Sequence, residues 1–287
     1  MLSWKKKSFF FLFLATFLCG CFQSTIAQTR STDKITSEEI FTFTGSRDYI
    51  YLFNWSTKKC KNTRIKGHDP ALSPDGKKIV FAVVKSYTGG IFVMNIDGSD
   101  KKKITKGSYE RVMSRPQWSP DGKKIFFIAS RYNRDKEEWI WGIYVMNIDG
   151  TEETLVKATE GSYFDLSPDG TKIAFKGSNG LYIMNSDGTD DKTIYKKSGA
   201  IRWSPNGKKI VFSDGWNLYT IDPDGSDLKL IVKQRKSSVF GPIGICVWTW
   251  TPDSKKIIYV ESAEGPFMGR FWIINTDGTD RKPWRWH

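Results

Sequence analysis

The sequence predicts an all-β fold, a six-bladed β-propeller in which each blade is a meander of four antiparallel strands. Two observations lead to this prediction. A segment of the type Leu/Trp-Ser-Pro-Asp-Gly-Lys-Lys-Ile occurs five times with small variations, and a segment of the type Ile-x-Val-Met-Asn-x-Asp-Gly follows each copy. The prolines of the first segment are 46, 48, 37 and 47 residues apart: Pro74, Pro120, Pro168, Pro205 and Pro252. Without its insertions, a repeat of about 40 residues has the length of one four-stranded blade.

Strands and turns can be assigned inside one repeat. Residues 77–83 and 90–96 are rich in Ile, Val and Phe, as strands are. The Pro-Asp-Gly between strands supplies a turn, because proline presets φ, aspartate accepts hydrogen bonds from nearby amides and glycine tolerates positive φ. The Asn-x-Asp-Gly segment closes a second hairpin. One repeat position holds large apolar residues that we interpret as blade-to-blade core: Leu72, Trp118, Leu166, Trp203 and Trp250.

A sixth, degenerate repeat precedes the five clear ones. Residues 39–44 supply a strand, and residues 50–54 with 57–65 match the second half of the repeat, but the innermost strand has no recognisable signature. We therefore predict a propeller over residues 39–287, with seven blades as the alternative. The expected blades are approximately 39–66, 67–107, 114–159, 161–197, 199–234 and 245–285.

The N-terminus has the features of an export signal. Three lysines, Lys5 to Lys7, precede an apolar run at 8–18 that is too short to span a bilayer, so residues 1–20 are predicted to be a signal peptide. Leu18-Cys19-Gly20-Cys21 resembles the lipobox of bacterial lipoproteins, which implies lipidation of Cys21, with residues 21–38 as anchor and linker. Cleavage after Ala27 is the alternative and would give a soluble protein. Both alternatives export the chain: the lipidated form to the periplasm or cell surface, attached to a membrane, and the form cleaved after Ala27 as a soluble periplasmic or secreted protein.

Charge and compartment limit the partners that we expect. The net charge is +13, and removal of the signal peptide takes away three lysines and no acid, so the mature protein stays basic. A basic surface could attract an acidic envelope glycan. Lysines at turns and edge strands also serve to keep strands unpaired with other chains. For an exported chain we expect no nucleic-acid partner, a monomeric state, and membrane attachment through the lipid only.

The sequence offers little for catalysis or metal binding. His68 and His287 are its two histidines, and no Gly-x-Ser-x-Gly nucleophile motif occurs. Aspartate-rich turns such as 95–100 lack the terminal glutamate of an EF-hand calcium loop. We therefore expect no enzymatic activity, cofactor or metal, with a glycan- or peptide-processing activity as the alternative. A disulfide between Cys60 and Cys246 is left open.

The two paired segments resemble the TolB-type, WD-repeat-like propeller repeat, over roughly residues 40–285. The same repeat occurs in propeller domains attached to prolyl oligopeptidase-like enzymes. Proteins of the TolB type carry an α/β domain before the propeller, whereas here residues 22–38 precede the first blade, and the oligopeptidase relatives carry a hydrolase domain. The resemblance therefore implies a stand-alone, non-catalytic propeller in the cell envelope. It specifies the fold more closely than the function.

Two groups of residues are candidates for binding. In a meander blade the repeated turns share one face of the disc and the variable connections share the other, where binding residues are usually found. The variable connections contain aromatic and arginine side chains typical of interaction hot spots: Tyr109, Arg111, Arg131, Tyr132, Arg134, Trp139, Trp141, Phe240, Phe267 and Arg270. An alternative for Trp139 and Trp141 is that they begin a strand and pack. The residues three before the repeat prolines could line a central channel: Ala71, Gln117, Asp165, Arg202 and Thr249.

These observations favour an exported, lipid-anchored scaffold that binds an envelope protein or peptide through its variable face. The alternative is a glycan-binding or glycan-active propeller, which the basic charge and the aromatic side chains would also suit.

Overall fold

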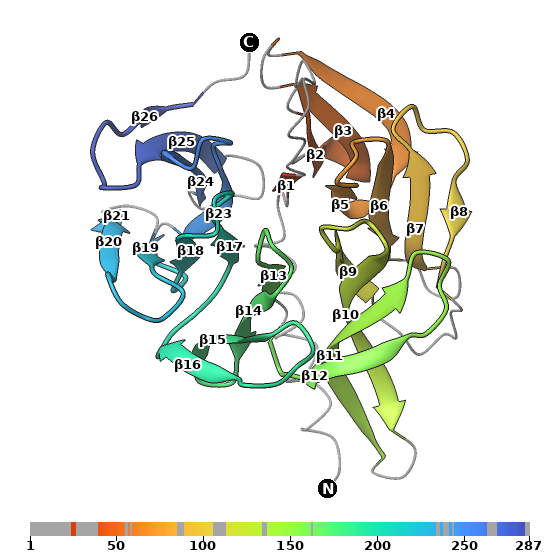
Figure 1. Ribbon diagram of the computed structural model, residues 1–287. Coiled ribbons are helices and arrows are strands. Elements are labelled where there is room, and N and C mark those ends of the chain that lie inside the picture. Colours follow the sequence, from red (N-terminus) through yellow and green to blue (C-terminus); the bar gives the residue numbers. More distant parts are fainter. Residues whose placement is uncertain are drawn as a thin grey trace, which may run out of the picture.

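The structure is a computed structural model that describes residues 24–26, 40–54, 57, 59–84, 89–105, 113–133, 137–161, 163–233, 236–237, 241–242, 244–262 and 269–284. Six four-stranded antiparallel sheets stand around a central axis and follow one another in sequence order, so the predicted six-bladed propeller is confirmed (Figure 1). Within these residues, no helix is both long and apolar enough to cross a membrane.

Each blade is a meander of consecutive strands. Blade 1 consists of β1 (Ser24–Ile26), β2 (Ile40–Thr44), β3 (Tyr49–Asn54) and β4 (Cys60–Lys66). Blade 2 consists of β5 (His68–Leu72), β6 (Lys78–Val83), β7 (Gly90–Asn95) and β8 (Lys102–Lys103). Blade 3 consists of β9 (Met113–Trp118), β10 (Lys124–Asn133), β11 (Glu138–Asn147) and β12 (Thr154–Ala158).

The second half of the ring has the same construction. Blade 4 consists of β13 (Phe164–Leu166), β14 (Lys172–Gly177), β15 (Gly180–Asn185) and β16 (Lys192–Tyr195). Blade 5 consists of β17 (Ile201–Trp203), β18 (Ile210–Ser213), β19 (Leu218–Ile221) and β20 (Lys229–Val232). Blade 6 consists of β23 (Gly244–Trp250), β24 (Lys256–Ser262), β25 (Gly269–Asn275) and β26 (Lys282–Pro283). A short ribbon of β21 (Lys236–Ser237) and β22 (Gly241–Pro242) lies between blades 5 and 6 in sequence. The first strand of each blade is nearest the axis (Figure 1).

The innermost strand of blade 1 is the one that the repeat signature did not reveal. It is β1, which pairs antiparallel with β2, Ser24 opposite Phe43 and Ile26 opposite Phe41. This strand falls within residues 21–38, the segment that we expected to be anchor and linker. Three residues without a Ser-Pro-Asp-Gly turn carry no repeat pattern, and only the pairing with β2 assigns them to the blade.

The Ser-Pro-Asp-Gly turn is closed by its own side chains. In blade 2, Ser73 Oγ donates a hydrogen bond to Asp75 Oδ1 (2.6 Å) and accepts one from the N–H of Lys78 (2.8 Å). Asp75 Oδ1 also accepts from the N–H of Lys77 (3.1 Å), and Gly76 has a φ of 71°. The same hydroxyl contacts recur at Ser119, Ser167, Ser204 and Thr251. The repeated aspartates therefore serve as turn residues.

The second repeated turn is built in a similar way and is tied to the first. Asp97 Oδ1 accepts hydrogen bonds from the hydroxyl and the N–H of Ser99, and this hydroxyl bond is the main reason that the pKa of Asp97 is lowered. Lys78 Nζ donates to Asn95 Oδ1 at 3.1 Å and so links the two turns of blade 2. Equivalent lysine contacts are Lys172 to Asn185 and Lys209 to Asp222, and in blade 6 Lys256 instead reaches Asp280 at the far end of the second turn.

Neighbouring blades are held together by buried apolar side chains and by indole hydrogen bonds. Each of six hydrophobic clusters spans one interface between adjacent blades. The tryptophans that we assigned to this core are buried there, and each indole Nε1 donates to a carbonyl oxygen of the preceding blade. These bonds are Trp118 to Ala71 (3.1 Å), Trp203 to Asp165 (3.1 Å) and Trp250 to Arg202 (3.2 Å).

An aromatic seam closes the ring between blades 1 and 6. Phe41, Phe43 and Phe53 of blade 1 pack with Ile258 and Ile273 of blade 6. Trp284, which follows β26, lies edge-on to Phe53 with ring centroids 6.1 Å apart and also contacts Phe271. In the described strands both terminal blades are complete in themselves, so closure rests on side-chain packing.

Two repeat glycines provide a test of how closely the blades approach. Gly170 (φ 75°) and Gly122 (φ 70°) both adopt a left-handed conformation, but a Cβ on Gly170 would lie 2.7 Å from Pro120 of the preceding blade, whereas one on Gly122 would lie 3.8 Å from Pro74. Both substitutions to alanine should cost about 1–2 kcal/mol for the backbone conformation. Gly170→Ala should cost about 1–3 kcal/mol more for overpacking. Urea unfolding of the two variants measures this difference, and equal losses would contradict the proposed proline–glycine contact between blades.

Candidate functional site

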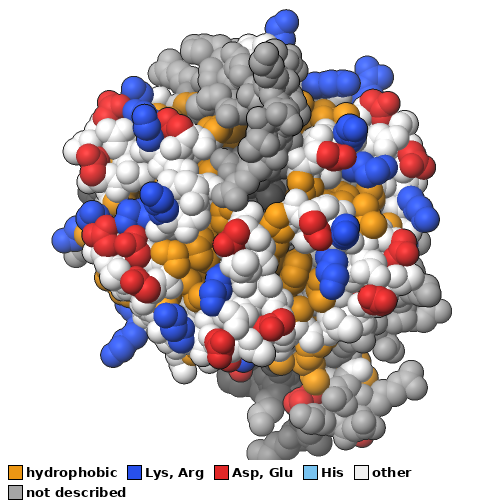
Figure 2. All heavy atoms as spheres, in the orientation of Figure 1, with side chains coloured by type: hydrophobic (Ala, Val, Ile, Leu, Met, Phe, Trp, Pro, Cys, Tyr) orange, Lys and Arg blue, Asp and Glu red, His pale blue; other side chains and the backbone are white. Residues whose placement is uncertain are grey.

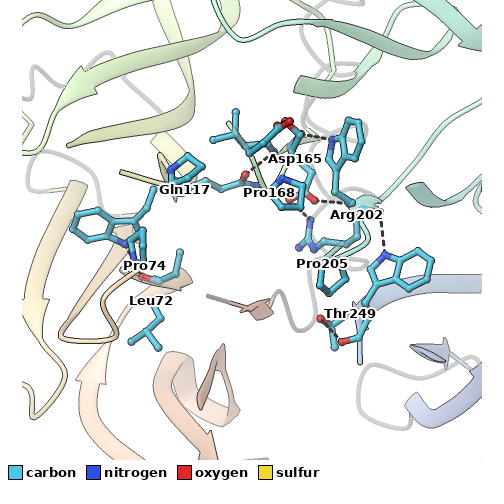
Figure 3. A pocket seen from close by; sticks show the side chains of 16 residues that line it. Leu72, Pro74, Gln117, Asp165, Pro168, Arg202, Pro205 and Thr249 are labelled. Atoms are coloured by element: carbon cyan, nitrogen blue, oxygen red, sulfur yellow. Dashed lines mark hydrogen bonds and ion pairs between the residues drawn. The ribbon is translucent and has the colours of Figure 1, made fainter. Parts of the chain in front are cut away.

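A cavity of about 390 Å³ lies on the propeller axis, at the end that carries the Ser-Pro-Asp-Gly turns (Figure 3). Its walls are repeat prolines and the apolar residues that precede them, including Pro74, Pro120, Pro168, Pro205, Trp203 and Trp250. Its polar lining includes Gln117, Asp165, Arg202 and Thr249, the four residues that the sequence suggested for a channel, and Ala71 lines it as well. Because these residues hold equivalent positions on successive innermost strands, they come together around the axis.

Asp165 is the centre of a hydrogen-bond network at the base of this cavity. Its Oδ2 accepts the backbone N–H of Trp203 at 2.7 Å, and its Oδ1 accepts from Gln117 Nε2 at 3.1 Å. Gln117 is fixed in turn, because its Nε2 also donates to the carbonyl of Phe164 and its Oε1 accepts from the N–H of Leu166. The network joins blades 3, 4 and 5 and holds the carboxyl group in one orientation.

Arg202 faces the same carboxyl group. Its Nη1 lies 3.8 Å from Asp165 Oδ1 and donates to the carbonyl of Ile201 at 2.9 Å, and the two charged side chains are 11% and 12% exposed. Burial outweighs the attraction of Arg202 and raises the pKa of Asp165 to about 6. Burial also lowers the pKa of Arg202, and the neighbouring positive charge of Arg115 contributes to this. The pKa of Asp165 therefore lies well above that of an exposed aspartate.

A second group of side chains lies beside this network. Asp69, Arg115 and Tyr163 each stand two residues before a lining residue of their blade. Asp69 (φ 50°) and Arg115 (φ 57°) adopt left-handed conformations at bulges in β5 and β9, and such bulges re-aim side chains. Asp69 Oδ2 accepts the N–H of Arg115 at 3.1 Å, and the guanidinium of Arg115 lies 3.9 Å from the centroid of the Tyr163 ring.

Two arginine nitrogens near the axis lack acceptors. Among the described residues, Arg115 Nη1 and Arg202 Nε are buried without a hydrogen-bond partner. The sequence analysis did not single out Arg115 for the axis. Its position within the repeat could have identified it, because Arg115 lies 46 residues after Asp69, the same interval that separates Pro74 from Pro120.

On the opposite face, the hairpin between β10 and β11 extends past the disc (Figure 1). Near its tip, Tyr132 and Trp139 are 39% and 50% exposed and contact each other edge to face, with ring centroids 5.4 Å apart. Trp141 is half-buried and packs against the cluster between blades 3 and 4. Trp139 and Trp141 both lie in β11, but one is presented to solvent and the other belongs to the core.

The other residues predicted for the variable face divide into two groups. Tyr109, Arg111, Arg134, Phe240 and Phe267 lie outside the described residues, as do the lipidation site Cys21 and the alternative cleavage site at Ala27. Arg131 and Arg270 lie in β10 and β25, but their side chains are outside the description. Sequence reasoning missed Trp216, which is 45% exposed in the short hairpin between β18 and β19. An aromatic residue directly after Asp214-Gly215 at a hairpin tip was the available signal.

The cysteines, the histidines and the possible metal ligands remain to be placed. Cys60 is an exposed, free cysteine on the outermost strand of blade 1, whereas Cys246 lies on the innermost strand of blade 6. His68 is half-buried in β5, and His287 lies outside the described residues. In the described part of the chain, no three His, Cys, Asp or Glu side chains form a group that could hold a metal ion. Basic and acidic side chains are interspersed over the face shown in Figure 2.

Comparison with known families identifies proteins that are similar to this chain. Residues 34–233 match the family described as TolB beta propeller domain. The chain belongs to the TolB beta propeller domain family. A TolB homolog of Chlorobium luteolum is 32% identical over 110 residues, which cover 37% of this chain and 22% of that protein. The matched segments span less than half of the length of the curated relatives.

Solved structures extend the similarity over most of the chain. A putative TolB from Agrobacterium tumefaciens has a TM-score of 0.61 at 20% identity and covers 82% of this chain and 87% of its own. An oligogalacturonate lyase in complex with manganese has a TM-score of 0.58 at 14% identity, covering 90% and 77%. At these identities the likeness concerns the fold, and TolB-type propellers and enzymes share it.

The raised pKa of Asp165 predicts a pH dependence of stability. A carboxyl group with a pKa of about 6 in the folded state and about 3.9 in the unfolded state contributes stability that is complete below about pH 4 and is lost as the pH rises through 6. The expected loss is roughly 3 kcal/mol, and Asp165→Asn should remove it. Urea unfolding of both proteins between about pH 4 and pH 7 measures the difference in slope. Parallel curves would show that Asp165 ionises normally in the fold.

Proposed function

We propose that this TolB-type propeller is an exported, lipid-anchored, non-catalytic scaffold that binds an envelope protein or peptide through its variable face. The observation that carries the proposal is the distribution of exposed aromatic side chains. Tyr132 and Trp139 lie at the ends of β10 and β11 next to their connection, Trp216 lies in the connection between β18 and β19, and all three are exposed. Large exposed aromatic residues gathered on one face are typical of protein interaction sites.

The geometry of the blade 3 hairpin strengthens this assignment. β10 and β11 pair over ten residue positions, from Lys124–Asn147 to Asn133–Glu138, so the aromatic pair stands on a continuous two-stranded support. Tyr132 and Trp139 are directly opposite each other in this register. Their edge-to-face contact limits the freedom of both rings, which lowers the entropy lost when a partner covers them.

The repeated charges favour a protein partner over an acidic glycan. Lysines at the repeat turns contact the asparagine or aspartate of the next turn, as Lys209 does with Asp222 (2.6 Å) and Asp227 (2.7 Å). Their charge is partly balanced within the blade, so the net charge of +13 does not by itself indicate a polyanion-binding surface.

We predict that a Tyr132→Ala/Trp139→Ala double variant loses most of its envelope partner without losing its fold. Both side chains are substantially exposed, so truncation should change unfolding free energy by less than about 1 kcal/mol. Loss of an aromatic hot spot should weaken binding by about 2 kcal/mol or more. Quantitative cross-linking and mass spectrometry of the envelope fraction measures partner recovery. Leu155→Ala, at a 47% exposed position on the outermost strand β12, is the matched control. Equal recovery by wild type, double variant and control would exclude this hairpin as the interface.

We also predict that the mature protein begins at Cys21 and carries acyl chains. Mass spectrometry of the N-terminal peptide measures this, and Cys21→Ala should release the protein from membranes because the lipid is the proposed attachment. A mature N-terminus at Gln28 without lipid would contradict this prediction and would show that the protein is released in the soluble form.

A further inference from the structure

We propose that Arg202, with Arg115 beside it, makes the base of the axial cavity a binding site for a ligand carboxylate. This site lies at the end of the axis that carries the repeat turns, and the inference does not rest on the proposed function of the opposite face.

The first argument is unsatisfied donor capacity. A guanidinium offers five N–H donors, and Arg202 uses Nη1 on the carbonyl of Ile201 while its Nε has no acceptor. Arg115 Nη1 is likewise buried without an acceptor. An unpaired buried donor on a charged group is costly, and a carboxylate is the acceptor that best matches the guanidinium fork.

The second argument is the surrounding charge. The charged and titratable groups that act on Arg202 are Asp165 on β13, Arg115 on β9, Asp69 on β5 and Tyr163 just before β13. Asp69 is oriented by the backbone N–H of Arg115, and Asp165 by Trp203 and Gln117. With Asp165 ionised, two arginines balance two aspartates; with Asp165 protonated, the cluster carries one positive charge. A bound carboxylate restores neutrality in the second state.

The third argument is the shape and lining of the cavity. Prolines and tryptophans line it together with the polar residues Gln117, Arg202 and Thr249 (Figure 3). A cavity of about 390 Å³ falls within the range of small-molecule sites. The ligand that fits is an acid with a short apolar body, such as a branched aliphatic acid or the C-terminal end of a peptide.

Asp165 gives the proposed site a pH dependence. Its carboxyl group lies 3.8 Å from Arg202 Nη1, so the ionised form competes with a ligand carboxylate for this guanidinium and the protonated form does not. Because burial raises the pKa of Asp165 to about 6, binding should be tighter near pH 5 than near pH 8. The C-terminal carboxylate of a peptide, with a pKa of about 3.5, stays ionised over this range.

Isothermal titration calorimetry of the full chain in low-chloride buffer tests the proposal, near pH 5 and near pH 8. The probes are acetyl-Ala-Ala-Leu, the same peptide with a C-terminal amide, and isovalerate. We expect the acid to bind more tightly near pH 5 and the amide to bind at least about tenfold more weakly, as loss of a charge-assisted contact predicts. Binding of isovalerate as tight as that of the peptide acid would assign the site to small acids, whereas binding of the peptide acid alone would assign it to peptide ends.

Three variants complete the test. Arg202→Gln should weaken binding of the acid at least about tenfold, while Lys208→Gln, which removes the same charge from an exposed turn of the same blade, should leave it unchanged. The Asp165→Asn variant should bind the acid tightly at both pH values. If Arg202→Gln does not fold, this variant alone tests the proposal. Equal binding of acid and amide, unchanged affinity in folded Arg202→Gln, a pH dependence that persists in Asp165→Asn, or no binding of any acid would overturn the proposal.

Discussion

Apolar burial between neighbouring blades is the interaction on which the rest of this structure depends. A four-stranded meander has two large faces, and each can be removed from water only by packing against another blade. The six hydrophobic clusters perform this role at the six interfaces, and at three of them the indole of Trp118, Trp203 or Trp250 also donates a hydrogen bond to the preceding blade. The ring closes because Phe41, Phe53 and Trp284 complete the last interface with blade 6.

The same constraint determines where function is possible. In blades 2 to 6 the innermost strand ends in a repeat turn, so equivalent positions of these blades converge on the axis. The repeat always has a proline and, two residues before it, a leucine or tryptophan, but it places Ala71, Gln117, Asp165, Arg202 and Thr249 at the converging position. This variation within a fixed frame produces a buried Asp–Arg pair whose surroundings differ from those of the exposed turn aspartates.

The fold could be predicted from the sequence because the turn chemistry repeats in register. Ser73, Asp75 and Gly76 recur with the same roles in later blades, and their spacing identifies the meander. The strand β1 could not be predicted, because its three residues pair with β2 through backbone contacts that leave no side-chain pattern. The channel residues could be predicted because each lies three residues before a repeat proline. The role of Arg115 could not, because it depends on a bulge in β9 that places its guanidinium over the Tyr163 ring. Trp216 was missed because one exposed residue in a four-residue hairpin has no periodicity.

A crystal structure of the protein with a bound carboxylic acid, grown near pH 5, tests the central claim most directly, namely that residue variation at the axis has built a carboxylate site into an otherwise structural repeat. The account predicts the ligand carboxylate within hydrogen-bond distance of the Arg202 guanidinium, with its apolar body between the repeat prolines and with Asp165 still held by Trp203 and Gln117. A ligand bound elsewhere, or an Arg202 guanidinium fully paired with Asp165 at this pH and no ligand in the cavity, would contradict it.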